Sequence, residues 1–179
     1  SQRQITTGGM IGGDRMIHHN YADIYAKYLQ CYVNTKSDLT ILECGILKGT
    51  GLAVWSILFP NAKIIGMDID LNYTRDNLDA LKERGAFGNG TPVLLECDQF
   101  DSNTSKLDDA LGGRKIDIVI DDGFHSNESI LNTFDALEGF LAPDFVYFTE
   151  DNPNVVNEFK SKYSRYKIFG YGELTVITP

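Results

Sequence analysis

The segment 116–125 constrains the fold more than any other part of this chain. Its first five residues are apolar except for one Asp, as is typical of a strand buried on both faces of a parallel sheet. Asp121 and Asp122 follow at the carboxyl end of that strand, the edge where open α/β sheets bind ligands. Gly123 allows a sharp turn that brings His125 close. Two carboxylates and an imidazole there indicate a metal site, a proton transfer, or both.

The same acids have a purely structural alternative. Asp and Ser side chains commonly accept hydrogen bonds from the free amides at the start of a helix. A helix is expected to begin near Asn127. In this alternative, Asp121, Asp122 and Ser126 cap that helix and bind no ligand.

Strands and helices are expected to alternate along the rest of the chain. Apolar runs predict seven strands, at 39–45, 62–70, 93–97, 116–120, 145–148, 166–169 and 174–178. Amphipathic or capped segments predict helices at 52–59, 71–82, 106–111, 128–141 and 155–163. Gly170 to Gly172 is short enough to join the last two strands as a hairpin. The pattern predicts a doubly wound, mostly parallel seven-stranded α/β sheet with a C-terminal antiparallel hairpin.

The chain of 179 residues is long enough for one domain with its own core. We expect residues 1–13 to be a flexible Gly-rich arm and residues 14–179 to form that domain. Cys31, Cys44 and Cys97 are expected to be reduced core thiols, as in cytoplasmic proteins. No apolar run is long enough for a membrane span, and the first residues lack the apolar segment of a signal peptide.

The net charge of −9 argues against a general affinity for nucleic acid or for anionic lipid. Both of these partners require clustered Lys and Arg side chains. The composition therefore favours a small-molecule substrate.

A first helix is expected downstream of His18 and His19. Tyr21, Ile24, Tyr25 and Tyr28 recur at helical spacing, so they are expected to pack on the body of the fold. The two histidines precede this helix in a polar segment. Each is either a ligand contact or an ordinary exposed side chain, and the sequence leaves both alternatives open.

A glycine-rich turn follows the first predicted strand, with the pattern Gly45-x-x-x-Gly49-x-Gly51. Such a turn brings backbone amides and a helix N-terminus against a ligand. Asp68 ends the next strand, where an acid can accept hydrogen bonds from both hydroxyls of a ribose. Nicotinamide and flavin enzymes place G-x-G-x-x-G directly after the strand, and this spacing differs. Glu43 inside the strand suits the ammonium of a methionine-type ligand, which favours S-adenosylmethionine over a dinucleotide.

Together these motifs resemble the class I S-adenosylmethionine-dependent methyltransferases. More narrowly, they resemble the metal-dependent sugar O-methyltransferases of macrolide biosynthesis and the related cephalosporin hydroxylase-like proteins. The resemblance runs from about residue 12 to residue 152. The matched positions are Gly12, Asp14, Arg15, His19, Tyr21, Tyr25, Leu42 to Gly45, Gly49, Trp55, Phe59 to Ala62, Gly66 to Asp70, Asp98 to Asp101, Ile120 to His125, and Glu150 with Asp151.

The resemblance implies specific roles for the acids at the strand ends. The residues expected around S-adenosylmethionine are Glu43, Gly45, Gly49, Asp68, Asp98, Gln99 and Asp121. Asp122 and Asp151 would hold a magnesium ion, and His125 would act as general base beside Asp122. Asn152 is either a further metal ligand, since amide oxygens bind hard cations, or a cap of the following helix.

Two departures from the family pattern affect the acceptor. The usual Pro-Gly-Gly before the fifth strand reads Ala142-Pro143-Asp144, and Asn152-Pro153-Asn154 replaces an aromatic segment. The insertions that build the acceptor pocket in related enzymes are absent from this sequence. A minimal fold would take a small or exposed acceptor, or would complete its pocket from a second subunit of a homo-oligomer.

The sequence thus predicts a magnesium-dependent O-methyltransferase that acts on a hydroxyl of a sugar or another small molecule. One alternative is a non-catalytic module that keeps the nucleoside cleft. A less favoured alternative is a nicotinamide-dependent oxidoreductase.

Overall fold

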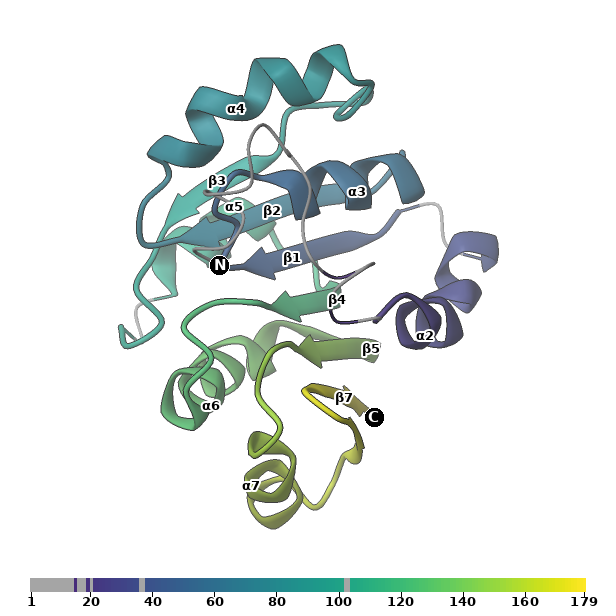
Figure 1. The fold of residues 1–179 in the computed structure, drawn as a ribbon, viewed down its shortest axis with the longest axis vertical. Helices are drawn as coiled ribbons and strands as arrows, with labels where there is room; N and C mark the ends of the chain where they lie inside the picture. The colour runs from purple at the N-terminus through teal and green to yellow at the C-terminus, as the bar shows by residue number, and fades with distance from the viewer. Residues whose placement is uncertain (1–14, 16–18, 20, 36–37, 102–103) are drawn as a thin grey trace.

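The computed structural model describes residues 15, 19, 21–35, 38–101 and 104–179 (Figure 1). The predicted arm of residues 1–13 lies outside these described residues, as do Asp14 and His18.

A seven-stranded sheet forms the centre of the molecule, with the order β3-β2-β1-β4-β5-β7-β6. Its first five strands run parallel, and β7 runs antiparallel to both of its neighbours, β5 and β6. The strands are β1 (Thr40–Cys44), β2 (Lys63–Asp68), β3 (Val93–Glu96), β4 (Ile116–Asp121), β5 (Leu141–Thr149), β6 (Lys167–Tyr171) and β7 (Leu174–Thr178). This architecture confirms the predicted doubly wound sheet and its C-terminal hairpin.

Helices cover both faces of the sheet, so the molecule has three layers (Figure 1). The first face packs against α2 (Ala22–Thr35), α3 (Thr50–Leu58) and the two ends of α4 (Asn72–Glu83). The second face packs against α5 (Ser105–Leu111), α6 (Asn127–Leu137) and α7 (Val155–Lys162). Consecutive strand residues supply the two cores in turn, because side chains alternate across a strand. Ile118 packs in the first core and Val119 in the second.

The tyrosines predicted to pack on the body of the fold do so. Tyr21 and Tyr25 are buried in the first core, and Tyr28 packs against it. The helix α2 begins at Ala22 and presents this stripe to the sheet. Asp117, near the start of the buried strand β4, accepts a hydrogen bond of 2.9 Å from the backbone amide of Thr40, which meets the need of a buried carboxylate for a donor.

Two of the differences between the predicted and the observed boundaries have a clear physical reason. The predicted helix 128–141 ends at Leu137, a 3-10 turn η1 (Glu138–Phe140) follows, and Leu141 already pairs with Ile116 in the sheet. Gly139 weakens the helix locally, and strand pairing then decides the conformation of the residues after it. The hairpin turn consists of Gly172 and Glu173 rather than 170–172, because Gly170 and Tyr171 pair with β7.

The cysteines differ in their burial. Cys44 is buried as expected and Cys97 is half-buried, but Cys31 is exposed because it lies on the solvent side of α2. All of them are free thiols. Among the described helices, none combines the length and the apolar character that crossing a membrane requires.

Candidate active site

The five parallel strands, β1 to β5, bring their carboxyl ends to one edge of the sheet. Backbone hydrogen bonds continue past the strand ends there: the Asp122 amide donates to the Cys44 carbonyl at 2.9 Å, and the Glu150 amide donates to the Asp121 carbonyl at 2.9 Å. A cleft of about 780 Å³ opens at this edge. Of the residues predicted from the sequence, it is lined by Glu43, Gly45, Asp68, Asp98, Gln99, Asp122 and His125.

The glycine-rich turn crosses the cleft wall in close contact with the loop after β4. Gly45 has a φ of 79°, and a Cβ at this position would lie 2.0 Å from the backbone oxygen of Asp122. Only glycine fits such an approach in the left-handed region. The Asp68 carboxylate shapes the turn, because its Oδ2 accepts hydrogen bonds of 2.9 Å from the amides of Ile46 and Leu47.

Gly49 and Asp98 have different surroundings from those of Gly45. Gly49 does not line the cleft; it precedes α3 with a φ of 73°, where a Cβ would lie 2.9 Å from a methyl group of Thr74. Asp98 is exposed at the cleft rim, and its Oδ1 accepts a hydrogen bond of 3.0 Å from the amide of Phe100. Gly49 therefore shapes the helix start, whereas Asp98 faces the cleft.

Asp121 supports Gln99 from below the cleft surface. The buried Asp121 carboxylate accepts hydrogen bonds from Gln99 Nε2 at 2.8 Å and from the hydroxyl of Tyr147 at 3.2 Å. Gln99 Oε1 in turn accepts the amide of Phe124 at 2.8 Å. Burial raises the pKa of Asp121 to about 7, although both hydrogen bonds oppose the shift. Asp121 thus holds Gln99 in place without lining the cleft itself.

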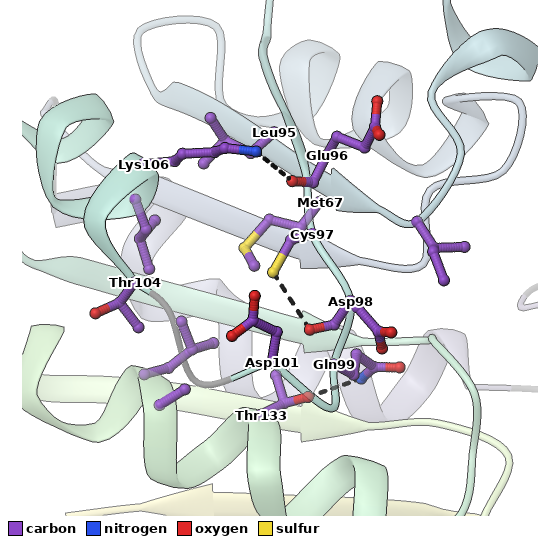
Figure 2. Close-up of a pocket in the computed structure, with 14 residues that line it drawn as sticks. Met67, Leu95, Glu96, Cys97, Asp98, Gln99, Asp101, Thr104, Lys106 and Thr133 are labelled. Carbon is purple, nitrogen blue, oxygen red and sulfur yellow. Dashed lines mark hydrogen bonds between the residues drawn. The ribbon is translucent and has the colours of Figure 1, made fainter.

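A smaller cavity of about 230 Å³ continues from the cleft on the α5 and α6 side of the sheet (Figure 2). The two cavities share Met67, Ile69, Cys97, Asp98 and Gln99. Leucine side chains of β3, α5 and α6 line the deeper part. Gln99 lines both cavities, and its Nε2 also donates to Thr133 Oγ1 at 2.8 Å (Figure 2).

Arg15 joins three acids at the centre of the edge. Its Nε lies 2.6 and 2.8 Å from the two carboxylate oxygens of Glu150. Its Nη2 donates to Glu43 Oε1 at 2.6 Å and to Asp122 Oδ2 at 2.8 Å. Glu43 and Glu150 are almost fully buried, and the hydroxyl of Tyr25 also donates to Glu150. Sequence reasoning placed Arg15 and Glu150 among the matched motif residues but assigned no role to either in the site.

Burial and charge act in opposite directions on these acids. Burial raises the pKa of Glu43, and the Arg15 guanidinium opposes the shift. Burial also raises the pKa of Asp122, again against Arg15, and the neighbouring carboxylate of Glu150 raises it further. One guanidinium therefore leaves an excess of negative charge among the acids at this edge.

Asp122, His125 and Asp151 lie together as predicted, with one potential ligand atom of each within 4.8 Å of the others. His125 Nε2 is 3.8 Å from Asp122 Oδ1. His125 and Asp151 have φ values of 63° and 57°, in the left-handed region that side chains other than glycine rarely occupy. Such strain clusters at functional sites, and here it occurs at two of the three grouped residues.

The two helix-capping alternatives have different outcomes. Ser126 is the N-cap of α6 and accepts the Ser129 amide at 3.0 Å. Asp121 and Asp122 do not cap α6, because their carboxylates bind Gln99 and Arg15 instead. The capping alternative therefore holds for Ser126 alone among these three.

For Asn152 the structure favours the capping alternative over a metal ligand. Its Oδ1 accepts the amides of Asn154 at 2.8 Å and Val155 at 3.0 Å, at the start of α7. Its Nδ2 donates to the His125 carbonyl at 2.8 Å and to Asn127 Oδ1 at 2.7 Å. The buried amide group thus has hydrogen-bond partners within the protein for both its oxygen and its nitrogen, and one of these bonds is to the carbonyl of the strained His125.

No protein-family model matches the chain. Mycinamicin VI 2''-O-methyltransferase from Micromonospora griseorubida is 28% identical to it over 142 residues, which are 74% of this chain and 31% of that protein. This chain therefore spans about a third of the length of that relative.

Solved structures share the fold. The MycE methyltransferase of the mycinamycin biosynthetic pathway, in complex with Mg and SAH, superposes with a TM-score of 0.68 at 20% identity, covering 99% of this chain and 52% of that one. Precorrin-6y C5,15-methyltransferase from Geobacter metallireducens superposes with a TM-score of 0.61 at 17% identity, covering 95% of this chain and 93% of that one. The chain therefore has the class I S-adenosylmethionine-dependent methyltransferase fold that its motifs predicted.

Proposed function

We propose that this protein is an S-adenosylmethionine-dependent and magnesium-dependent O-methyltransferase, acting on a hydroxyl of a sugar or another small molecule. The observation that carries the proposal is the grouping of Asp122, His125 and Asp151 beside the cleft. The sequence similarity to mycinamicin VI 2''-O-methyltransferase supports transfer of the methyl group to an oxygen.

The cleft fits S-adenosylmethionine in size and in chemistry. Its volume of about 780 Å³ lies within the range of small-molecule sites. Glu43 Oε2 and the Trp55 indole nitrogen are both buried, and neither makes a hydrogen bond of normal geometry with the described residues. This carboxylate oxygen suits the ammonium of the methionine part. Asp68 would then accept hydrogen bonds from the ribose, with the adenine toward the Ile69 and Asp98 side.

Asp122 and Asp151 suit a hard divalent cation, because carboxylate oxygens are the ligands that Mg²⁺ prefers. When bound there, Mg²⁺ supplies Lewis acidity that lowers the pKa of an acceptor hydroxyl. Glu150 remains with Arg15 and Tyr25 in this arrangement. Asn152 is not part of the proposed set, since its amide caps α7.

His125 would take the proton from the acceptor hydroxyl. Its Nδ1 lies 3.3 Å from the Glu150 carbonyl, which can only accept a hydrogen bond, so Nε2 is free to act as the base. As the O–H proton passes to Nε2, the oxygen forms a bond to the methyl carbon. S-adenosylmethionine, when bound, would supply the methyl group, and the electron pair of the S–C bond would stay on sulfur in S-adenosylhomocysteine. Alignment of oxygen, carbon and sulfur supplies much of the rate.

A second candidate function is a non-catalytic nucleoside-binding module. The ion pairs of Arg15 with Asp122 and Glu150 favour it, because the guanidinium already neutralises part of the acid centre. In that case the cleft would bind the nucleoside while no methyl group is transferred. The free thiols support a reducing location such as the cytoplasm for either function.

Calorimetric titration with S-adenosylhomocysteine, with Mg²⁺ and then with a chelator, tests the cofactor. Methyl transfer to simple sugars and catechol-like diols tests the reaction, with Asp122→Asn as the variant. The proposal expects binding by both proteins and transfer by the wild type only. Binding without transfer to any acceptor in the panel would favour the module. Absence of binding in both conditions would overturn both functions.

A further inference from the structure

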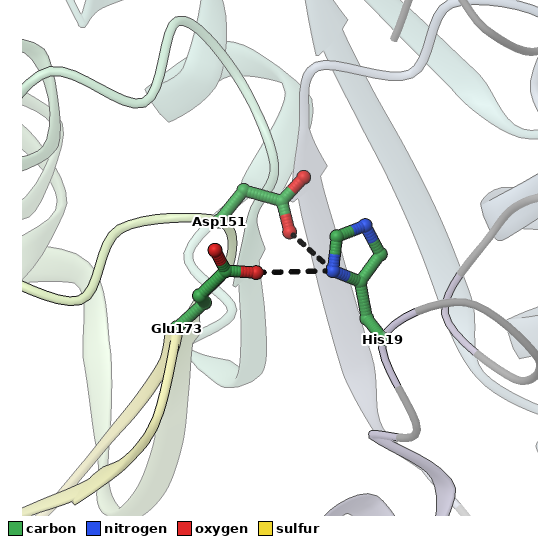
Figure 3. A group of neighbouring side chains, drawn as sticks. All are labelled: His19, Asp151 and Glu173. Carbon is green, nitrogen blue, oxygen red and sulfur yellow. Dashed lines mark hydrogen bonds and ion pairs between the residues drawn. The ribbon is translucent and has the colours of Figure 1, made fainter.

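A second group of metal-ligating side chains shares Asp151 with the group at Asp122 (Figure 3). It consists of His19, Asp151 and Glu173, which come from the segment before α2, the end of β5 and the turn between β6 and β7. His19 Nδ1 is 3.2 Å from Glu173 Oε2 and 3.6 Å from Asp151 Oδ1. Figure 3 shows both carboxylates directed at the same ring nitrogen.

The spacing of these atoms is that of ligands around one cation. With metal–donor distances near 2.0 Å, neighbouring donors of a tetrahedral site lie about 3.3 Å apart. The distances of 3.2 and 3.6 Å from His19 Nδ1 fall on either side of this value. One nitrogen and two carboxylate oxygens suit Zn²⁺ or Mn²⁺ better than Mg²⁺, because imidazole favours transition metals.

Other contacts fix the positions of the three donor side chains. The hydroxyl of Tyr21 donates to Asp151 Oδ1 at 2.9 Å, and the His19 and Tyr21 rings stack with centroids 5.2 Å apart. The Asn152 amide donates to the Glu173 backbone oxygen at 3.0 Å, which ties the hairpin turn to the end of β5. The Glu173 side chain is 53% exposed, so a cation can reach the group from solvent.

We propose that His19, Asp151 and Glu173 form a second divalent-cation site, of the Zn²⁺ or Mn²⁺ type, which shares Asp151 with the site at Asp122. Asp151 would then bridge two cations, one on each side of its carboxylate. The second cation would link His19 to Glu173 in the hairpin turn. The inference rests on the proposed function only through the role of Asp151 in the first site.

Titration of the full chain with Mn²⁺ alone tests the inference, because the electron paramagnetic resonance signal of free Mn²⁺ reports how much is bound. We expect the wild type to bind two equivalents, and Glu173→Gln and His19→Gln to bind one equivalent each. Asp135→Asn is the matched control, since this acid pairs with Lys162 away from the site, and it should still bind two. Circular dichroism confirms that each variant is folded.

Asp122→Asn distinguishes the two sites. If Glu173→Gln loses one equivalent while Asp122→Asn loses none, the second site stands and the metal part of the proposed function fails. If Asp122→Asn loses one equivalent while Glu173→Gln and His19→Gln bind as many as the wild type, the first site stands. That result would overturn the inference and leave His19 in ion pairs only.

Discussion

The Nδ1 atom of His125 lies 3.3 Å from the backbone oxygen of Glu150. Because a carbonyl oxygen only accepts hydrogen bonds, this contact places the proton on Nδ1 and leaves the lone pair on Nε2. Nε2 faces Asp122 at the cleft. The geometry depends on the positive φ of His125 and on the hydrogen bond from Asn152 to its carbonyl. The ring is therefore oriented by backbone contacts before any ligand binds.

Replacing His125 by Ala should reduce methyl transfer by about 10²- to 10⁴-fold, the usual contribution of a general base. The affinity for S-adenosylhomocysteine should stay within about twofold, because the proposed nucleoside contacts come from β1, β2 and the Asp98 loop. Rates and calorimetric affinities of the two proteins check both expectations. A variant that keeps the wild-type rate would remove His125 from the mechanism.

Replacing Gly45 by Ala should lower the unfolding free energy by more than the usual cost of placing Ala in the left-handed conformation. A Cβ at Gly45 meets the backbone oxygen of Asp122 at 2.0 Å, whereas one at Gly113, with a similar φ of 83°, meets nothing within 4 Å. Gly113→Ala is therefore the matched control, expected to cost about 1–2 kcal/mol. The clash should add about 1–3 kcal/mol to Gly45→Ala. Urea unfolding of both variants measures the difference, and equal costs would contradict the predicted close approach.

Asp121→Asn should change how stability depends on pH. Burial raises the pKa of Asp121 to about 7 from an ordinary 3.8. Between those values the unfolded state loses the proton while the folded state keeps it. The unfolding free energy of the wild type should therefore fall, relative to the variant, as the pH rises from about 4 to about 7, and the difference should then level off.

Over this pH range, the unfolding free energy of the wild type should fall relative to that of the variant by at most about 4 kcal/mol, at 1.36 kcal/mol for each unit of pKa. Urea unfolding at several pH values without divalent cations measures it. A difference between the two proteins that stays constant across this range would show that Asp121 titrates normally in the folded protein.

Arg15→Met should destabilise the protein by about 3–5 kcal/mol near neutral pH, because it leaves Glu43 and Glu150 buried without their cation. Arg114→Met is the control. Arg114 pairs with Asp38 at 2.6 Å, but both side chains are largely exposed, and such surface pairs contribute at most about 1 kcal/mol. Chemical unfolding of both variants gives the comparison. Equal losses would mean that Arg15 contributes no more than a surface ion pair.

Local sequence patterns predicted most of the fold correctly. The strands β1, β2 and β4 are nearly continuous apolar runs, because both of their faces are buried. The boundary at Leu141 was wrong because pairing with Ile116, and not the helical pattern, sets its conformation. The acids at the strand ends were placed correctly, since parallel strands bring their carboxyl ends to one edge.

The sequence by itself determined the alternation of strands and helices, the glycine-rich turn and the edge at which Asp68, Asp122 and Asp151 collect. These features follow from local periodicity and from the geometry of parallel sheets. Only the tertiary structure decided which partner each acid contacts. Arg15 meets Glu43, Asp122 and Glu150 across separations of 28, 107 and 135 residues, and His19 meets Glu173 across 154. No local pattern encodes such contacts, because charge pairing depends on which segments the folded sheet brings together.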